Sequence, residues 1–199
     1  FLLLLFSFRI ILMLVKGNFL IIISGPSGAG KSSITSKLLS SSKNLDFSVS
    51  YTTREKRINE HESNDYIYVS REKFEELIET NSFLEYEIVH GHYYGTPIQP
   101  INEAMGFNHS VLLDIDVKGA STIINTNHFD CVSFFIRPPS IEDLHQRLVN
   151  RGDMKDHEIE KRVAEAKNEI MKSKYFDHLI VNENFEDCFN EIKRIIVGL

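Results

Sequence analysis

The stretch that decides the fold is LIIISGPSGAGKSS, Leu20 to Ser33, where an apolar run enters a glycine-rich turn that ends in a lysine and serines. Residues 25–32 satisfy the pattern G-x-x-x-x-G-K-[ST] between an expected strand and an expected helix. In that context backbone N–H groups turn inward around phosphate oxygens, and the positive end of the following helix adds to the attraction. The alternative is a glycine-rich turn that merely caps the helix. The spacing predicts a nucleoside triphosphate site.

Two side chains of this loop have distinct expected roles. Lys31 would reach the β- and γ-phosphates, and the hydroxyl of Ser32 would bind Mg²⁺. The expected ATP-binding residues in and directly after the loop are Gly25, Pro26, Ser27, Gly28, Ala29, Gly30, Lys31, Ser32 and Ser33. The loop predicts the phosphoryl donor and its metal, but it does not identify the acceptor.

Composition excludes several other classes of protein. The 199 residues are 42% hydrophobic, enough for the core of one sizeable domain, and the net charge of −6 argues against a general nucleic-acid binder. Cys131 and Cys188 form no C-x-x-C pair, so neither a disulfide framework nor a thiolate metal site is indicated. The eight histidines show no H-E-x-x-H spacing. No nucleic-acid partner is expected.

The first residues are strongly apolar, but Arg9, Lys16 and Gly17 interrupt them before about 18 to 20 continuous apolar residues accumulate. No basic region precedes the apolar run and no small-residue cleavage site follows it, so a secretory signal is not indicated. We interpret residues 1–12 as an upstream extension ahead of Met13, with a genuine anchor as the alternative. A cytoplasmic protein without a membrane partner is expected.

Apolar runs alternate with helical patterns along most of the chain, which is typical of a doubly wound α/β fold with a parallel sheet flanked by helices. The expected strands are Phe19–Ser24, Phe47–Ser50, Val111–Asp116, Cys131–Ile136 and His178–Val181. The expected helices are Ser32–Ser42, Lys118–Asn125, Ile141–Asn150, His157–Lys174 and Phe185–Val197.

The alternation breaks between residues 51 and about 97. There the pattern predicts strands at Tyr66–Val69 and Phe83–His90 around one helix at Arg71–Thr80, a small α+β insertion. A second insertion is expected around Arg151–Asp156, where the sequence is charged and poor in apolar residues. We therefore expect a core of residues 17–50 and 97–199, with residues 51–96 as the inserted unit.

An acceptor site is indicated by SVSYTTREKR, in which Arg54 and Arg57 stand three apart after a strand end. A rigid guanidinium with five donors suits a dianionic phosphate, so two of them could clamp a monophosphate. Taken alone, such a pair is more often a solvated basic face.

Several further motifs follow in order: DYIYV, FLEYEIVHGHYYGT, LLDIDVKGA, PPSIEDLHQRL, NRG, KRV and LIVNENF. With the loop and the arginine segment, they make residues 17–197 resemble the guanylate kinase family, P-loop enzymes that phosphorylate GMP with ATP. The resemblance implies transfer from ATP to GMP giving ADP and GDP, with Mg²⁺ as cofactor and dGMP as a further candidate acceptor. It implies a GMP-binding role for the insertion and a lid at about residues 147–162. A monomer or a homodimer is expected.

The resemblance also implies a role for individual side chains. Implied GMP-phosphate contacts are Arg54, Arg57, Tyr66 and Tyr94, and implied guanine-side contacts are Ser50, Glu85, Thr96 and Asp116. Asn182 would lie near the adenine, and Asp114 would join Ser32 at the metal. The implied catalytic residues are Lys31, Arg54, Arg147, Arg151 and Arg162, of which the last three belong to the lid.

Each implied role has a physical reason and a structural alternative. Glu85 can accept from two donors of guanine, whereas adenine would leave the carboxylate without partners, a basis for strong selectivity. Without the neighbouring HYYGT, Glu85 would be read as an exposed strand carboxylate, and Tyr66 and Tyr94 as core aromatics. Arg147 and Arg151 could form a solvent-exposed helix stripe. Asp114 and Asp116 alternate with a single residue between them and so are expected to point to one face, toward the cleft.

The chain departs from the family pattern after Arg57, where Asn59 and Ser63 replace the usual glycines while Glu60 is retained. Two other functions stay open. A different nucleoside monophosphate kinase would lack the set Ser50, Glu85 and Thr96, and a non-catalytic guanylate-kinase-like module that binds peptides would typically have a damaged phosphate loop.

Overall fold

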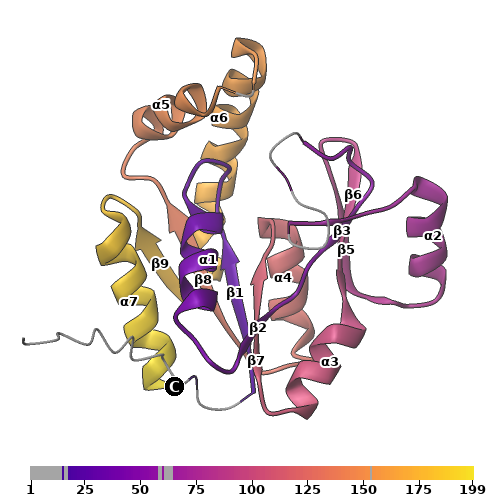
Figure 1. Ribbon diagram of the computed structural model, residues 1–199. Helices are drawn as coiled ribbons and strands as arrows, with labels where there is room; N and C mark the ends of the chain where they lie inside the picture. The colour runs from indigo at the N-terminus through magenta and orange to yellow at the C-terminus, as the bar shows by residue number, and fades with distance from the viewer. Residues whose placement is uncertain (1–14, 16–17, 58–59, 61–64, 153) are drawn as a thin grey trace, which may run out of the picture.

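A five-stranded parallel sheet with strand order β2-β7-β1-β8-β9 forms the centre of the molecule (Figure 1). The computed structural model describes residues 15, 18–57, 60, 65–152 and 154–199. The strands of this sheet are β1 (Leu20–Ser24), β2 (Leu45–Phe47), β7 (Ser110–Asp114), β8 (Cys131–Arg137) and β9 (His178–Val181). All strands run in one direction, so their carboxyl ends meet at one edge, where ligands bind in open α/β sheets.

Helices cover both faces of this sheet, which explains why its central strands are apolar throughout rather than alternating. In β1, Ile21 and Ile23 pack in one hydrophobic cluster, whereas Leu20 and Ile22 pack in another. The first cluster holds residues of α1 and α7, and the second holds residues of α3, α4 and α6. The bounds of these helices are α1 (Lys31–Ser40), α3 (Ile98–Gly106), α4 (Val117–Thr126), α6 (Asp156–Met171) and α7 (Phe185–Gly198).

The insertion is a separate four-stranded sheet with strand order β4-β3-β6-β5, backed by one helix and placed beside the core (Figure 1). Its elements are β3 (Tyr51–Thr52), β4 (Ile67–Tyr68), α2 (Arg71–Glu79), β5 (Phe83–Val89) and β6 (His92–Pro97). Phe74 of α2 is fully buried and stacks against the rings of Phe83 and Tyr93. This small aromatic core gives the insertion its own packing, distinct from the two clusters of the main sheet.

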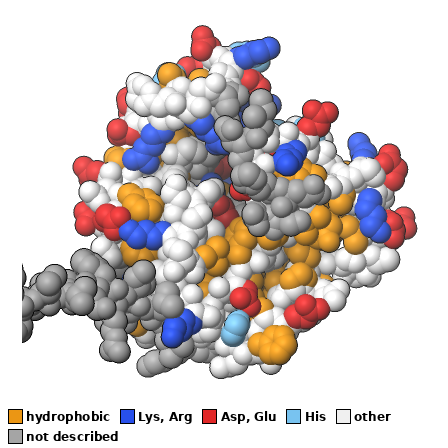
Figure 2. Space-filling model, viewed as in Figure 1, with side chains coloured by type: hydrophobic (Ala, Val, Ile, Leu, Met, Phe, Trp, Pro, Cys, Tyr) orange, Lys and Arg blue, Asp and Glu red, His pale blue; other side chains and the backbone are white. Residues whose placement is uncertain are grey.

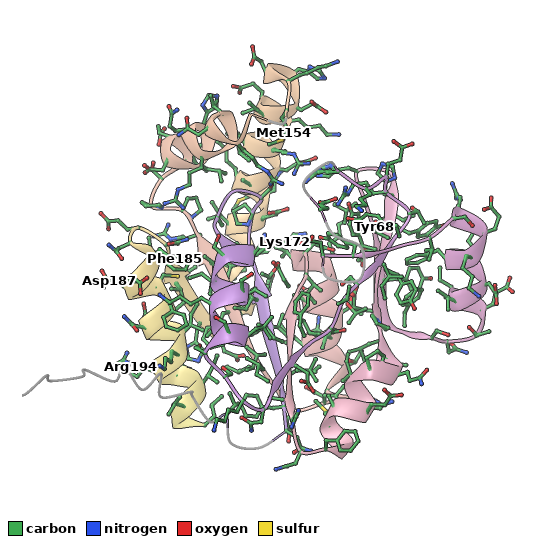
Figure 3. The ribbon with its side chains drawn as sticks, viewed as in Figure 1. Tyr68, Met154, Lys172, Phe185, Asp187 and Arg194 are labelled. Carbon is green, nitrogen blue, oxygen red and sulfur yellow. The ribbon has the colours of Figure 1, made fainter. Side chains whose placement is uncertain are left out.

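A helical hairpin, called the lid here because it includes the residues expected to form one, stands above the carboxyl edge of the central sheet (Figure 1). It consists of α5 (Ile141–Arg151) and the first part of α6, joined by a short turn. Leu144 and Leu148 of α5 pack against Ile159 and Val163 of α6, and Met154 of the turn, labelled in Figure 3, covers this cluster. The lid therefore has a hydrophobic core of its own, and the charged segment expected as a second insertion is the turn between its helices.

The expected strands and helices of the core are all present, and His178–Val181 has the predicted bounds. Four expected core elements are wrong by two residues or more at an end. The strand expected at Phe47–Ser50 is Leu45–Phe47, and the strand Val111–Asp116 stops at Asp114. The helix Ser32–Ser42 stops at Ser40, and the helix His157–Lys174 stops at Met171 before a 3₁₀ turn, η1 (Ser173–Tyr175).

Three elements were not expected from the sequence. β3 has two residues and is too short to show a period, and β6 follows β5 after a tight turn at His90 and Gly91, both with positive φ. Helix α3 follows Pro97 and contains Pro100 in its first turn, where proline is tolerated because the N–H has no helical partner. Because of these prolines, the sequence did not predict this helix, which packs in the core.

Some expectations fall outside the described residues: the extension at residues 1–12, and the replaced glycines at Asn59 and Ser63. Within the described part of the chain, no helix combines the length and the apolar character that crossing a membrane requires.

Candidate active site

The phosphate loop occupies the turn between the buried strand β1 and helix α1, at the carboxyl edge of the central sheet. Gly25 has φ of 137°, and a side-chain carbon there would overlap the backbone oxygen of Ile136 in β8. The first glycine of the motif is thus required both by the backbone turn and by the neighbouring strand. The loop is therefore fixed by backbone geometry before any side chain acts.

Lys31 begins helix α1, and its ammonium folds back over the loop. Its Nζ donates to the carbonyl oxygen of Gly25 at 2.6 Å and to that of Pro26 at 3.2 Å. These are neutral acceptors, so a bound phosphate would compete for the ammonium with a full negative charge. The contacts keep Lys31 at the loop without neutralising it.

Ser32 and Asp114 are brought together from α1 and the end of β7. The Ser32 hydroxyl donates to Oδ2 of Asp114 at 3.3 Å. Burial raises the pKa of Asp114 above its usual range, against the opposing effects of the nearby Lys31 charge and the Ser32 hydrogen bond. A hydroxyl and a carboxylate are oxygen ligands that a hard cation such as Mg²⁺ prefers. Among the described residues, no group of three or more His, Cys, Asp or Glu side chains is suited to hold a metal by itself.

The donor side is completed by residues from the end of β9 and from the lid. Asn182 is buried, and its Nδ2 donates to the carbonyl of Ala29 in the loop at 2.7 Å. Arg147 of α5 donates to the backbone oxygen of Asn182 at 2.8 Å, and Arg162 of α6 donates to the Ser27 hydroxyl at 3.0 Å. Basic side chains gather beneath α5 in the space-filling view (Figure 2). The lid thus contacts the phosphate loop directly through Arg162, and through Arg147 it contacts Asn182, which is itself bonded to the loop.

Two further expected donor-side residues are exposed to solvent. Arg151 is the last residue of α5, and Ser33 lies in the first turn of α1. Of the two residues for which a solvent-exposed stripe was the alternative, Arg147 is half-buried, whereas Arg151 lies on the surface.

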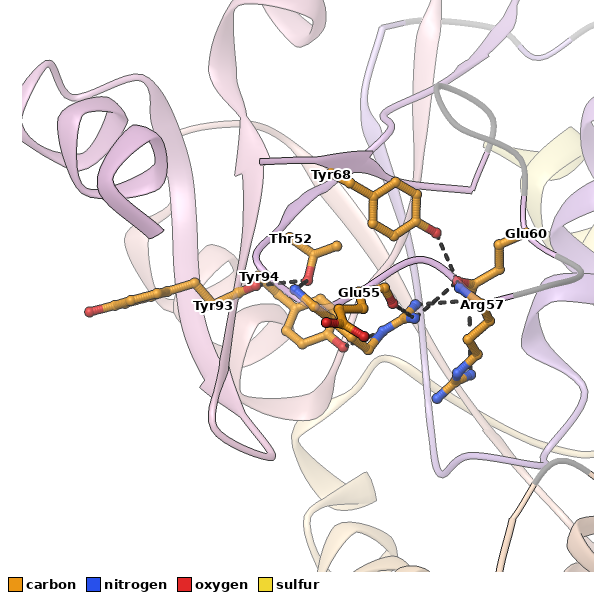
Figure 4. A network of polar contacts seen from close by, with 8 residues as sticks. Thr52, Glu55, Arg57, Glu60, Tyr68, Tyr93 and Tyr94 are labelled. Atoms are coloured by element: carbon orange, nitrogen blue, oxygen red, sulfur yellow. Dashed lines mark hydrogen bonds and ion pairs between the residues drawn. The ribbon is translucent and has the colours of Figure 1, made fainter. Parts of the chain in front are cut away.

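On the insertion, Arg54 lies at the centre of a polar network that Figure 4 draws. Its guanidinium makes a bidentate ion pair with Glu60, at 2.9 and 2.8 Å, and its Nε donates to the Tyr94 hydroxyl at 3.1 Å. Glu60 also accepts from the Arg57 backbone N–H at 2.9 Å and from the Tyr68 hydroxyl at 2.8 Å. One carboxylate therefore joins Arg54, Arg57 and Tyr68.

Charges within this network are strongly stabilised. Burial alone would raise the pKa of Glu60, but the hydrogen bonds from Arg54, the Arg57 backbone and Tyr68 outweigh it and lower the pKa to about 2. Burial alone would lower the pKa of Arg54, but Glu60 and Tyr94 raise it above the ordinary arginine value. Both groups stay charged at every ordinary pH, so Arg54 is held as a cation in a fixed place.

Aromatic rings surround the guanidinium of Arg54. It lies 5.4 Å from the ring centre of Tyr66 and 5.9 Å from that of Tyr68, and the rings of Tyr66 and Tyr94 meet edge to face at 5.7 Å. Burial raises the pKa of the Tyr66 hydroxyl, with the negative charge of Asp114 adding to the shift. The Tyr66 hydroxyl therefore remains protonated and can donate to an anion that Arg54 binds.

A second carboxylate of the insertion, Glu85, has a raised pKa, in contrast to the lowered pKa of Glu60. It is only 7% exposed, and its Oε1 accepts a short hydrogen bond from the Thr96 hydroxyl on the paired strand. Burial, with the nearby charges of Asp116 and Glu87, raises its pKa to about 7 despite the Thr96 hydrogen bond. Glu85 is therefore a buried acceptor with spare hydrogen-bonding capacity, which a ligand with N–H donors can satisfy.

The remaining expected acceptor-side residues adopt different positions. Ser50 is buried at 8% exposure just before β3. Asp116 does not lie on the β7 strand beside Asp114, as expected, because the strand ends first and the Asp116 carboxylate caps helix α4. Its Oδ1 accepts from the backbone N–H groups of Lys118 and Gly119 at 2.7 and 3.3 Å. A carboxylate at this position satisfies helix N–H groups that otherwise lack partners.

Three residues of the site were missed as functional candidates: Glu60, Tyr68 and Gly119. A side-chain carbon at Gly119 would come within 2.5 Å of Oε2 of Glu85, so helix α4 approaches that carboxylate only because the residue is glycine. A glycine inside a helix lowers the stability of that helix, so the glycine itself was the sequence feature that could have indicated a close contact here. For Glu60, the signal was an acid retained among replaced glycines three residues after Arg57.

Comparison with known proteins agrees with this geometry. The family model described as guanylate kinase matches residues 18–198. A guanylate kinase from Carboxydothermus hydrogenoformans is 41% identical over 179 residues, which cover 90% of this chain and 87% of that protein. One from Clostridioides difficile is 42% identical over 184 residues, covering 92% and 89%. The crystal structure of guanylate kinase from Anaplasma phagocytophilum matches with 32% identity and a TM-score of 0.75, covering 94% of this chain and 87% of that one. The chain belongs to the guanylate kinase family.

Proposed function

We propose that the chain transfers the γ-phosphoryl group of ATP to the phosphate of GMP, with Mg²⁺, and forms ADP and GDP. The observation that carries the proposal is the pairing of an intact phosphate loop with two anion- and base-binding groups on the insertion, Arg54 among tyrosine hydroxyls and the buried Glu85. A donor site and an acceptor site of matching chemistry are both required for transfer between nucleotides.

On the donor side, the loop backbone would bind the β- and γ-phosphates and Lys31 would neutralise them. Asn182 would orient the adenine from the end of β9, because it is anchored to the loop through Ala29. Arg147, Arg151 and Arg162 would bring positive charge to the transferred group when the lid lies over the loop. Ser32 and Asp114 would hold Mg²⁺, with phosphate oxygens and water as its other ligands. The ion, when bound, neutralises charge on the β- and γ-phosphates.

On the acceptor side, Arg54, Arg57, Tyr66 and Tyr94 would bind the GMP phosphate and place one of its oxygens in line with the γ-phosphorus. Glu85, with Thr96 and Ser50, would accept from the N1–H and the exocyclic amino group of guanine. Asp116 would lie beside this pocket, since its negative charge contributes to the raised pKa of Glu85. The attacking oxygen forms the new P–O bond as the bond to the β-phosphate oxygen of ATP breaks, and ADP leaves.

Selectivity for guanine would follow from the burial of Glu85. Adenine has no donor at N1, so it would leave a buried carboxylate unpaired, and a site of this kind can discriminate by about 10⁴ or more. Purine nucleotide metabolism in the cytoplasm is the setting that we propose for this activity.

A non-catalytic peptide-binding module remains the competing hypothesis, and the intact loop argues against it because binding a peptide requires neither Lys31 nor Ser32. The test is ADP formation with ATP and Mg²⁺, measured with GMP, dGMP, AMP, CMP and UMP as separate acceptors. We expect turnover with GMP and a rate lower by about 10³ or more with AMP. Equal rates with AMP and GMP would contradict the role of Glu85, and no ADP with any acceptor would contradict catalysis.

A further inference from the structure

A cavity of about 240 Å³ lies where the lid joins the core, apart from the residues proposed to bind nucleotides. It is formed by the end of β8, the loop 138–140 that leads into α5, and the side of α6 that carries Lys167 and Ile170. None of the phosphate-loop residues lines it, and neither does Arg147, Arg162 or Asn182. The cavity therefore lies between strand β8, which leads into the lid, and helix α6, which leads out of the lid.

One wall of this cavity carries a positive charge from Arg137, a half-buried residue. Arg137 is the last residue of β8, and strand alternation places it on the same face as Phe135, which packs in the cluster that includes Ile170 of α6. Its Nε is buried and has no hydrogen-bond partner within the described part of the chain. A buried guanidinium N–H without a partner is costly, and such a group calls for a bound ion, water or ligand.

A second positive charge faces the same space. Lys167 lines the cavity from α6. Asp143, in the first turn of α5, is not among the residues that line the cavity; it accepts from the Ser140 hydroxyl at 2.6 Å, and its backbone N–H donates to the same hydroxyl at 2.9 Å. Two basic side chains from different elements therefore line one cavity, and no acidic side chain of the described residues lines it. That arrangement favours an anion.

The other walls are apolar. Pro138 and Pro139 come from the loop, Ile141 from the start of α5 and Ile170 from α6. We propose that this cavity binds the phosphate group of a small phosphorylated molecule through Arg137 and Lys167, with the carbon part of the molecule against the prolines and isoleucines. The first turn of α5 adds the positive end of a helix to the same place. Inorganic phosphate shares this chemistry, and the test separates the two sources.

The experiment uses the full chain with GMP and a non-hydrolysable ATP analogue at saturation, so that both nucleotide sites are filled. Inorganic phosphate, phenyl phosphate and phenol are titrated separately, and backbone amide shifts of Ser140 and Ile141 are followed by NMR. We expect saturable shifts at these amides with phosphate or phenyl phosphate. Tighter binding of phenyl phosphate would identify an organic phosphate as the ligand, and equal or weaker binding would identify the inorganic ion.

Lys167→Met should weaken that binding by about tenfold, because it removes one charge-assisted contact at a position that is exposed on the helix. The matched control is Lys172→Met, an exposed lysine beyond the end of the same helix that does not line the cavity, and its binding should equal that of the unmodified chain. Arg137→Lys should be intermediate because it keeps the charge but not the fork of donors.

Either of two results would overturn the proposal: no saturable shift at Ser140 and Ile141 with any phosphate, or saturable shifts that Lys167→Met leaves unchanged. Shifts with phenol alone that match those with phenyl phosphate would also overturn it, because the apolar walls and not the cations would then bind the probe. These readouts are local to the cavity, so they stand whether or not the chain phosphorylates GMP.

Discussion

The two halves of the active site are built by different means. On the donor side the chain path itself makes the site, through a loop whose first glycine has φ of 137° and leaves no room for a side chain against β8. On the acceptor side the backbone only carries side chains, and a hub of hydrogen bonds at Glu60 places Arg54 and Tyr68. A site made by the backbone leaves a fixed spacing in the sequence, whereas a site made by side-chain contacts does not.

The halves also differ in how charge is controlled. The donor half keeps Lys31 on neutral carbonyls, but the insertion contains two carboxylates with opposite shifts, a pKa of about 2 for Glu60 and about 7 for Glu85. Both are removed from water, but Glu60 has donors from several residues, whereas Glu85 has only Thr96, through its hydroxyl and its backbone, and has acidic neighbours. One carboxylate is therefore structural at neutral pH, and the other is poised to exchange a proton for a ligand.

The largest effect is expected at the backbone-built half. Lys31→Met should lower kcat for GMP phosphorylation by about 10³ or more, since it removes a charge that stabilises the transferred group. The fold should be retained because Lys31 lies outside the hydrophobic clusters, and the midpoint of thermal unfolding checks this. Activity within threefold of the unmodified chain, in a folded variant, would remove Lys31 from the mechanism.

Glu85→Gln tests the acceptor half and should lower kcat/KM for GMP by about 2 to 4 kcal/mol in transition-state terms, because a donor would then face the donors of guanine. The KM for ATP should change little. If ATP binding is weakened to the same extent, Glu85 is not part of a base pocket and the division into two halves is wrong.

The same variant has a signed pH effect on stability. An unfolded Glu loses its proton near 4.5 and the folded Glu85 near 7, so ionisation costs the native state stability as pH rises between these values. Glu85→Gln has no such cost and should be more stable at pH 8 by up to about 3 kcal/mol, measured by denaturant unfolding. The affinity of the unmodified chain for GMP should fall as pH drops below about 7. The variant is the control for titration of the GMP phosphate itself.

The sequence predicted the fold around the phosphate loop almost completely and the fold of the insertion in outline. The loop, its helix and the five core strands follow from glycine spacing and apolar runs, which report local geometry. Asp116 was expected on the same strand as Asp114, because two acids separated by one residue fit the alternation of a strand. Its contacts with the backbone N–H groups of Lys118 and Gly119 show that it instead caps a helix. The contacts of Glu60 lie within eight residues along the chain, but in a segment without a strand or helix period, and Gly119 meets Glu85 from a distant part of the sequence.

Glu60→Gln should have a smaller effect, since it weakens the hub without removing a group proposed to touch GMP. We expect KM for GMP to rise by roughly tenfold while kcat changes less, because Arg54 loses the partner that fixes its place. The matched control is Glu75→Gln in the same insertion, where an exposed i,i+4 pair with Arg71 has little effect on stability. Equal effects of the two substitutions would show that the hub does not position Arg54.

The hub also predicts acid resistance. Because the pKa of Glu60 is lowered to about 2, its ion pair stabilises the native state above the unfolded value near 4.5 and loses this contribution only as pH falls toward 2. Glu60→Gln should therefore be destabilised relative to the unmodified chain at pH 6, and the difference should shrink at pH 3. A difference that stays constant over this range would mean that the carboxylate acts by packing rather than by charge.

The smallest effect is expected where the insertion meets the lid. His90 lies after β5, and its Nδ1 is 3.5 Å from Oε1 of Glu165 on α6. Burial lowers the pKa of His90, Glu165 raises it, and the positive groups Arg162, Lys161 and His92 lower it further. At neutral pH the imidazole is therefore mostly uncharged, and the contact becomes an ion pair only in acid. Loss of Glu165 should then matter more at pH 5.5 than at pH 8.

We expect Glu165→Gln to cost less than about 1 kcal/mol in the free energy of unfolding, with the larger cost at pH 5.5. In the His90→Gln background the same substitution should cost equally at both pH values, because no charge is then gained in acid. A cost in the unmodified background that is independent of pH would mean that the two groups do not interact as charges.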